Sequence, residues 1–144
     1  MIRVFVDASV LFAAAYSATG ASREIIRRAI RGEIGLVVSQ LVFEEVKRNL
    51  QDKVPGAIAD FDNFLDAVEF ELVRPSKDEI EAAMQYCAAK DAPIVAAAKK
   101  ANVDHLVSLD RRHLVGVPEV AAGSGLEIVL PSNLLEKIRR QEEE

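Results

Sequence analysis

The stretch Met1-Ile-Arg-Val-Phe-Val-Asp-Ala-Ser-Val-Leu-Phe12 decides the expected fold of the chain. Residues 2–6 are mostly apolar and β-branched, which predicts a buried strand. Asp7 ends this strand, and an apolar helix begins near Ser9. In an open parallel sheet, a carboxylate at this place points into the crevice where ligands bind. Because Asp is also a preferred helix N-cap, capping of the next helix is the simpler interpretation of Asp7.

The alternation of strand and helix continues along the rest of the chain. Further strands are expected at four places, which are residues 36–38, 70–73, 105–109 and 126–130. Helices are expected between them, including one capped by Ser22 and one that runs from a capping box at Ser76 to about Ala89. Residues 115–125 contain three glycines and a proline and are expected to be irregular. Five strands alternating with helices predict a three-layer α/β domain with a mainly parallel sheet and right-handed crossovers.

Length and composition limit the class of protein. The 144 residues suit one domain, which we expect over residues 1–140, followed by a frayed acidic end over 141–144. The single Cys87 excludes an internal disulfide framework and a thiolate metal site. No apolar run reaches membrane-spanning length and the first residues do not form a signal peptide, so a cytoplasmic protein without a membrane partner is expected. A net charge of −5 does not attract nucleic acid through the overall field, so RNA binding would need a local basic stripe or bound cations.

Three aspartates stand at the ends of expected elements. Asp7 and Asp110 each end an apolar strand, and Asp91 begins the buried helix before the Asp110 strand. Carboxylates crowded in one crevice repel each other unless a cation neutralises them. No paired-histidine or Cys/His motif occurs, so oxygen atoms are the expected metal donors, and these suit Mg²⁺ or Mn²⁺. Each aspartate also has a simpler interpretation as a helix cap or a turn residue.

Glu45 is the acid expected to join these aspartates from the helix over residues 40–50. At about 100° per residue, Glu45 falls on the apolar arc of that helix, whereas Glu44 falls on the solvated side with Lys47 and Arg48. A carboxylate on an inward face is unusual without a partner. The alternatives for Glu45 are an ion pair with a buried arginine or a place at the edge of the helix.

Four segments together resemble the successive motifs of the PIN-domain family, especially its VapC-like, prokaryotic toxin-type branch. They are Val6-Asp-Ala-Ser-Val-Leu11, Val38-Ser-Gln-Leu-Val-Phe-Glu-Glu-Val46, Asp91-Ala-Pro-Ile-Val-Ala-Ala-Ala98 and Leu106-Val-Ser-Leu-Asp-Arg-Arg-His-Leu114. The resemblance spans nearly the whole chain and implies an α/β/α sandwich with a mainly parallel five-stranded sheet. It also implies a divalent-metal-dependent ribonuclease acting on single-stranded RNA, with an antitoxin protein and a second copy of the chain as partners.

The resemblance also assigns roles to individual residues. It implies four catalytic acids, which are Asp7, Glu45, Asp91 and Asp110. Of these, the three aspartates are implied to bind Mg²⁺ or Mn²⁺, and Ser9 and Ser108 are implied to lie near the site and the substrate. Many family members carry a further acid two residues after the Asp110 position, where this chain has Arg112. A second metal is therefore expected to be weakly held or absent, and Arg112 is expected to meet substrate phosphate instead.

Several basic residues are candidates for contacts with RNA. Arg111 and Arg112 stand next to Asp110, and further candidates are Arg23, Arg27, Arg31, Lys47, Arg48 and Lys90. The alternative for each of them is a solvated face. Of the two histidines, His105 begins a strand and is expected to be structural, whereas His113 follows the arginine pair and is a candidate substrate contact.

Other functions fit the sequence less well than a nuclease does. A phosphoacceptor receiver domain would need a second acidic cluster early in the chain and a lysine after the last strand, and neither is evident. A phosphatase of the haloacid-dehalogenase type would need Asp-x-Asp where this chain has Asp7-Ala-Ser9. The stronger alternative is a catalytically weak or inactive PIN fold that serves as a binding module. The net charge and Arg112 favour this alternative, whereas the presence of all four acids argues against it.

Overall fold

The computed structural model describes residues 1–143, and within them five strands form one sheet. The strands are β1 (Ile2–Val6), β2 (Ile34–Val38), β3 (Phe70–Leu72), β4 (His105–Val107) and β5 (Ile128–Val129). They lie in the order β3-β2-β1-β4-β5, and every neighbouring pair is parallel. Because parallel strands run in one direction, the carboxyl ends of β1, β2 and β4 meet at one edge of the sheet.

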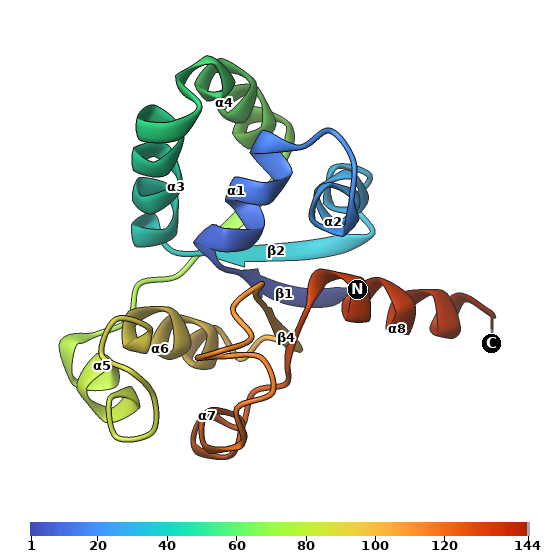
Figure 1. Cartoon of the computed structure of the whole chain (residues 1–144). Coiled ribbons are helices and arrows are strands. Elements are labelled where there is room, and N and C mark those ends of the chain that lie inside the picture. Colours follow the sequence, from blue (N-terminus) through green and yellow to red (C-terminus); the bar gives the residue numbers. More distant parts are fainter. Residues whose placement is uncertain (144) are drawn as a thin grey trace.

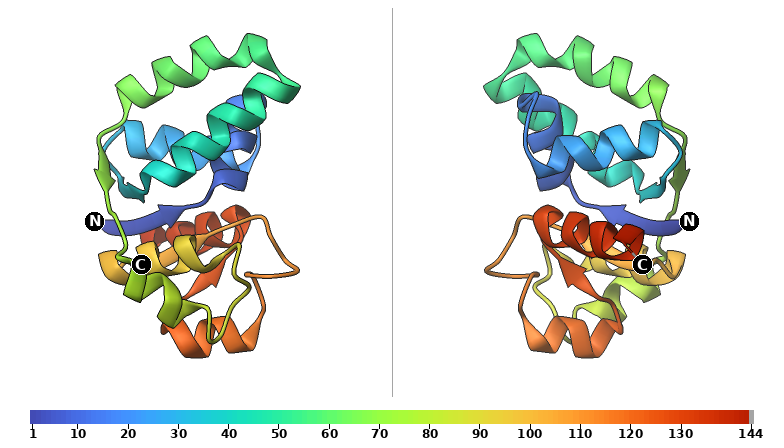
Figure 2. Two further views of the ribbon diagram at one scale, coloured as in Figure 1. Left: turned by 90° about the vertical axis from the view of Figure 1, so that its left-hand side faces the viewer. Right: turned by 90° about the vertical axis from the view of Figure 1, so that its right-hand side faces the viewer.

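Eight α-helices and one short 3₁₀ helix flank the strands in this part of the chain, and the last of them, α8, follows β5. They are α1 (Ala8–Tyr16), α2 (Ala21–Ile30), α3 (Gln40–Lys53), η1 (Pro55–Ala57), α4 (Ile58–Ala67), α5 (Lys77–Ala83), α6 (Ala92–Ala101), α7 (Pro118–Ser124) and α8 (Pro131–Glu143). Helices α1 to α4 lie on one side of the sheet, and α5 to α7 lie on the other (Figure 1). The two side views in Figure 2 show the same layers. The predicted three-layer sandwich with a parallel five-stranded sheet is therefore confirmed.

The central strand β1 explains why the first residues of the chain dominate the fold. Val4, Phe5 and Val6 are all fully buried, because β1 pairs with β2 on one side and β4 on the other while helices cover both faces. A strand in such a place carries apolar side chains on both faces instead of alternating with polar ones. The chain then leaves β1 at Asp7 and enters α1 directly.

Several element boundaries differ from the sequence prediction: α3 runs to Lys53 and not to residue 50, β4 ends at Val107 and not at residue 109, and β5 covers only Ile128–Val129. Helices α2 and α5 differ as well. Helix α2 begins at Ala21 with Gly20 as its N-cap, not with Ser22, because the backbone at this cap has a φ of 99° that glycine adopts most easily. Helix α5 ends at Ala83 instead of continuing to about Ala89. There the backbone changes to i→i+3 hydrogen bonds, such as Gln85 N–H to the carbonyl of Ala82, and these tighten the end of a helix.

Residues 118–124 form helix α7, so the prediction that residues 115–125 are irregular is wrong. Pro118 occupies the first turn, where a missing N–H costs nothing, and Gly125 ends the helix in the left-handed conformation with a φ of 72°. The proline and glycine thus mark the two ends of a helix. Gly123 lies against Tyr86, since a Cβ at this glycine would be 2.3 Å from Cγ of the tyrosine.

We expect Gly123→Ala to lower the free energy of unfolding by about 1–3 kcal/mol, because the new methyl group overlaps the Tyr86 ring near its attachment to the chain. The higher helix propensity of alanine offsets only part of this, about 1 kcal/mol. Thermal or urea unfolding measures the change. Gly56→Ala is the matched control, since a Cβ there meets nothing within 4 Å. Equal stability of the two variants would contradict the contact.

Helix α8 continues past residue 140, where the expected domain ended, and reaches Glu143. Glu142 forms an ion pair with Arg28 of α2, at 2.8 Å between the carboxylate and the guanidinium. Of the expected acidic end over 141–144, Glu144 lies outside the described residues. No helix within residues 1–143 is long and apolar enough to cross a membrane.

Candidate metal centre

Asp7 is both a helix cap and a buried acid at the carboxyl edge of the sheet. Its Oδ1 accepts hydrogen bonds from the Val10 N–H at 3.2 Å and the Ser9 hydroxyl at 2.5 Å. Only 7% of Asp7 is exposed. The two interpretations of Asp7 from the sequence therefore do not exclude each other, because one oxygen caps α1 while the side chain as a whole lies inside the molecule.

Ser108 connects Asp7 to Asp110. Its hydroxyl donates to Oδ2 of Asp7 and accepts from the backbone N–H of Asp110, at 3.0 Å in the second case. The connection follows from the sheet register, which places Val6 beside Val107 and so brings the ends of β1 and β4 together. Ser108 has no exposed surface. Its buried hydroxyl therefore contacts both Asp7 and the backbone of Asp110, and the substrate contact expected from the sequence stays a prediction.

The surroundings of Asp7 disfavour its charged form. Burial raises the pKa of Asp7, and the hydrogen bonds from Ser108, Ser9 and the backbone oppose this only in part. A buried carboxylate of this kind is stabilised by a nearby cation, which would restore its usual ionisation.

We expect Ser108→Ala to reduce metal affinity about 10–100-fold, as losses of groups that orient metal ligands do. The change leaves Oδ2 of Asp7 without its hydroxyl donor and removes the link to Asp110. Calorimetric titration with Mn²⁺ measures the effect. Ser108→Thr keeps the hydroxyl and should retain most of the affinity, and an alanine variant that binds metal as well as the parent would contradict this role.

Asp91, Asp110 and His113 form a compact group of ligand-type atoms. One atom from each residue lies within 4.8 Å of the other two. Asp110 is held in place by its own turn, because its Oδ1 accepts from the backbone N–H groups of Arg112 and His113 at 3.0 and 2.9 Å. Burial acts to raise the pKa of Asp110, but the hydrogen bonds from His113 and Arg112 outweigh it and lower the pKa overall. Asp110 is therefore presented as a carboxylate.

Asp91 is not explained as a helix cap. It occupies the N-cap position of α6, yet its side chain makes no capping hydrogen bond. Its Oδ2 is buried and has no hydrogen-bond partner within residues 1–143. Burial raises the pKa of Asp91, and the negative charge of Asp110 raises it further. A buried carboxylate oxygen without a donor requires an explanation, and a cation bound between Asp91 and Asp110 supplies one.

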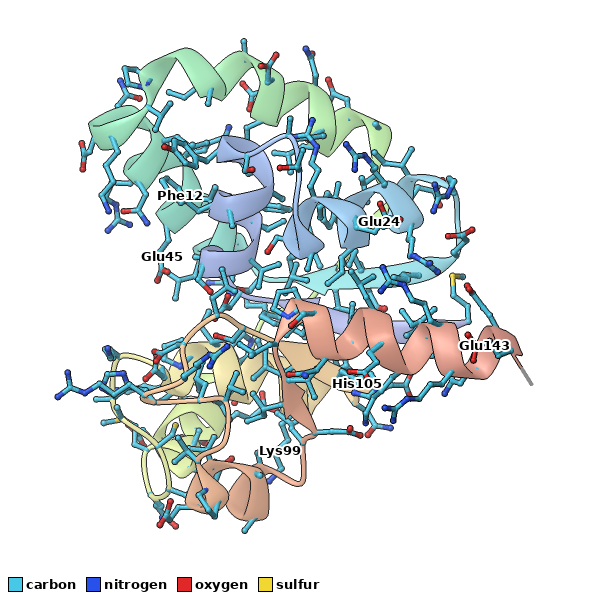
Figure 3. All side chains as sticks on the ribbon, turned by 45° about the vertical axis from the view of Figure 1, so that its right-hand side comes forward. Phe12, Glu24, Glu45, Lys99, His105 and Glu143 are labelled. Atoms are coloured by element: carbon cyan, nitrogen blue, oxygen red, sulfur yellow. The ribbon has the colours of Figure 1, made fainter. Side chains whose placement is uncertain are left out.

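Glu45 approaches the same region from α3, whose first turn is capped by Ser39. Figure 3 shows the Glu45 side chain beside the start of α1, against which α3 packs. Burial raises the pKa of Glu45, and the charges of Asp7 and Asp91 raise it further, while Arg48 acts in the opposite direction. Glu45 therefore lies within electrostatic range of two of the three aspartates. Glu44 is exposed and instead lines a groove of about 590 Å³ beside β3.

The comparison with protein families follows the same residues. The model of the PIN domain matches residues 4–118, a range that contains all four acids. The chain belongs to the PIN-domain family. No curated protein matches this PIN domain significantly in sequence.

Three solved structures resemble this PIN domain in fold at low sequence identity. PAE2754 from Pyrobaculum aerophilum matches with a TM-score of 0.67 and 20% identity over 96% of this chain and 90% of its own. VapBC2 from Rickettsia felis, bound to a promoter DNA fragment, matches with a TM-score of 0.64 and 13% identity over 90% and 98%. VapC20 from Mycobacterium tuberculosis, described as a toxin that cleaves the sarcin-ricin loop, matches with a TM-score of 0.52 and 21% identity over 76% and 91%.

Some of the candidate RNA-binding arginines already contact other parts of the protein. Arg23 donates to the carbonyl of Ala14 at 2.6 Å and stacks on Phe64, with its guanidinium carbon 3.8 Å from the ring centroid. Arg27 and Arg31 are also held, the first by the carbonyl of Ala18 and the second by acidic neighbours. These three residues therefore hold neighbouring segments together.

Arg111 and Arg112 are the basic residues next to Asp110 that remain free to contact a substrate. Both are exposed, and neither forms an ion pair within the described residues. Ser9 is partly exposed, and its hydroxyl accepts from the Leu109 N–H at 3.1 Å, so it lies at the same edge. His105 lies 3.6 Å from Glu127 at the other end of β4, which agrees with the structural role expected for it.

The one site residue that sequence reasoning underestimated is His113. We expected only oxygen donors, yet its Nδ1 lies 3.2 Å from Oδ2 of Asp110. The signal in the sequence was the spacing of three residues after an aspartate that ends a strand. That spacing brings the two side chains together because the chain turns tightly at Asp110. The sequence had offered a turn at Asp110, but not the contact between its carboxylate and the imidazole of His113.

Proposed function

We propose that this PIN domain is a divalent-metal-dependent ribonuclease that hydrolyses phosphodiester bonds of single-stranded RNA. The observation that carries the proposal is the buried Oδ2 of Asp91, which has no hydrogen-bond partner among residues 1–143 and lies beside the fixed carboxylate of Asp110. Asp7, Asp91 and Asp110 would hold Mg²⁺ or Mn²⁺, with Glu45 in support. When bound, such an ion stabilises negative charge on a phosphate and lowers the pKa of a coordinated water.

The protein residues contribute by preorganisation. Hydroxyl groups hold Asp7, and backbone N–H groups hold Asp110, so neither carboxylate has to reorganise when substrate arrives. Glu45 is partly exposed and faces the charges of Asp7 and Asp91, which places it to accept a proton from water during hydrolysis. Each of these residues thus has a distinct contribution.

Arg111 and Arg112 are the proposed contacts with the RNA backbone. They are exposed next to Asp110, and a guanidinium binds phosphate through paired hydrogen bonds. This local pair offsets the overall charge of −5, which would otherwise oppose binding of a polyanion. Ser9, at the same edge, is the further candidate for a substrate contact.

We also propose the partners of this PIN domain. The names of the similar structures from Rickettsia felis and Mycobacterium tuberculosis describe a VapBC complex and a toxin, which supports a toxin of a toxin–antitoxin pair for this chain as well. The corresponding partners are an antitoxin protein and a second copy of the chain. We further propose that residues 1–140 form a single domain that carries the whole site.

Incubation of the purified protein with labelled single-stranded RNA tests the proposed activity. Cleavage should require millimolar Mg²⁺ or Mn²⁺, stop on chelation, and be absent from Asp91→Asn. The matched control is Asp66→Asn, which changes an exposed aspartate on α4. Cleavage that survives chelation would contradict the proposal. Metal binding without cleavage of any RNA would instead favour the inactive PIN-fold binding module, which the net charge and Arg112 support.

A further inference from the structure

The imidazole of His113 lies among the carboxylates of the candidate metal centre. Its Nδ1 is 3.2 Å from Oδ2 of Asp110, and its ligand-type atom lies within 4.8 Å of those of Asp91 and Asp110. The backbone N–H of His113 donates to Oδ1 of the same aspartate. The turn therefore fixes the ring and the carboxylate side by side.

The 3.2 Å between Nδ1 of His113 and Oδ2 of Asp110 is a suitable distance for two atoms that bind the same ion. In a six-coordinate site with metal–ligand bonds of about 2.1 Å, neighbouring ligand atoms lie about 3 Å apart. Asp91 contributes the oxygen that has no donor within residues 1–143. A cation placed between the three residues would meet this oxygen, a carboxylate oxygen of Asp110 and a ring nitrogen.

We propose that His113 is a nitrogen ligand of this metal and makes the site prefer Mn²⁺ over Mg²⁺. The inference rests on the proposed metal-dependent function and specifies which ion the site takes. Mg²⁺ favours oxygen donors and gives up its waters reluctantly, whereas imidazole suits divalent transition metals. A mixed carboxylate–imidazole set therefore discriminates between the two ions in a way that carboxylates alone do not.

The competing role for His113 is purely positional. In that case Nδ1–H donates to Asp110, holds its carboxylate in place, and never meets the ion. The two roles differ in a measurable way. Loss of a positioning residue weakens both ions alike, whereas loss of a nitrogen ligand weakens mainly Mn²⁺.

Calorimetric titration of the full chain with MnCl₂ and MgCl₂, without RNA, separates the two roles. The parent protein should bind Mn²⁺ at least tenfold more tightly than Mg²⁺. His113→Asn should weaken Mn²⁺ binding about 10–100-fold, the range found when groups around a metal are lost, and change Mg²⁺ binding by less than about threefold. Asparagine keeps an amide that can donate to Asp110, so a positioning role would be rescued by it. Circular dichroism melts of each variant establish that the fold is retained.

The chain offers a clean spectroscopic control because it contains only two histidines. Pulsed electron paramagnetic resonance of bound Mn²⁺ should show coupling to nitrogen in the parent protein. The coupling should disappear in His113→Asn and persist in His105→Gln. His105 is the matched control because it begins β4, near Glu127 and away from the carboxyl edge of the sheet (Figure 3).

The results of these experiments can overturn the role of His113 and the proposed ribonuclease activity independently of each other. Equal Mn²⁺ affinity in the parent and His113→Asn, absence of nitrogen coupling, or no binding of either ion would overturn the role of His113. RNA cleavage with unchanged metal preference in His113→Asn would overturn this role alone. Nitrogen-coupled Mn²⁺ binding without cleavage of any RNA would support it and overturn the ribonuclease proposal alone.

Discussion

Asp7→Asn is expected to abolish RNA cleavage, by about 10³-fold or more, and at the same time to stabilise the metal-free protein. The neutral amide keeps the shape of the side chain but removes the charge that a cation needs. Ser9 and Ser108 can adapt, because a hydroxyl both donates and accepts hydrogen bonds. Stability rises because the buried carboxylate, whose pKa is raised mainly by burial, no longer has to ionise inside the protein.

The stabilisation should depend on pH in a defined direction. The pKa of Asp7 is higher in the folded protein than its unfolded value of 3.8. As the pH rises from the unfolded pKa to the folded pKa, ionisation of this group therefore favours the unfolded chain. The parent protein therefore loses stability from this group above about pH 4, and the loss is complete once the pH exceeds the folded pKa. Asp7→Asn lacks this loss. Its advantage in melting temperature, measured with a chelator present, should be small at pH 4 and larger at neutral pH.

Added metal should make the parent protein more stable relative to Asp7→Asn. A cation that binds only the folded state raises stability, so millimolar Mn²⁺ should raise the melting temperature of the parent protein and leave that of Asp7→Asn nearly unchanged. Asp66→Asn, at an exposed position, should follow the parent in both respects. A metal-free Asp7→Asn that is less stable than the parent at neutral pH would show that the folded protein favours the ionised carboxylate, which would contradict the raised pKa of Asp7.

The part of the fold near β1 was predictable because local and tertiary requirements agree there. An apolar run covered on both faces, followed by Asp7, has few alternatives to a central parallel strand that ends at a crevice. The same reasoning placed Asp110 after β4. The capping box at Ser76 and Glu79 was also predictable, since both of its reciprocal hydrogen bonds form between neighbours in the chain.

Features that depend on contacts between distant segments were not predictable. The α7 helix was missed because Gly123 appeared as a helix breaker, whereas its lack of a side chain makes room for Tyr86. The contacts of the arginine row on α2 were not predictable, because the acceptors of Arg23 and Arg27 lie in the preceding helix and loop respectively. Helical spacing shows which residues share a face, but it does not show what that face meets.

Glu45→Gln is expected to reduce cleavage about 10²-fold or more, within the range found for groups that take part in proton transfer. Burial and the charges of Asp7 and Asp91 raise the pKa of Glu45, so its ionisation responds to the metal centre. The amide cannot accept a proton, yet it keeps the size of the side chain. Single-turnover cleavage assays at saturating RNA, with either metal, measure the loss.

Glu44→Gln is the matched control, because it makes the same chemical change one residue away on the same helix. Glu44 is exposed and lines the groove beside β3, so its loss should alter the rate less than about twofold, as surface substitutions commonly do. A one-residue step turns the side chain by about 100° around α3, which decides whether a carboxylate faces the aspartates or the solvent. Equal losses in the two variants would mean that the negative charge of α3 as a whole matters. A loss confined to Glu45 would mean that its position toward Asp7 and Asp91 is what the site requires.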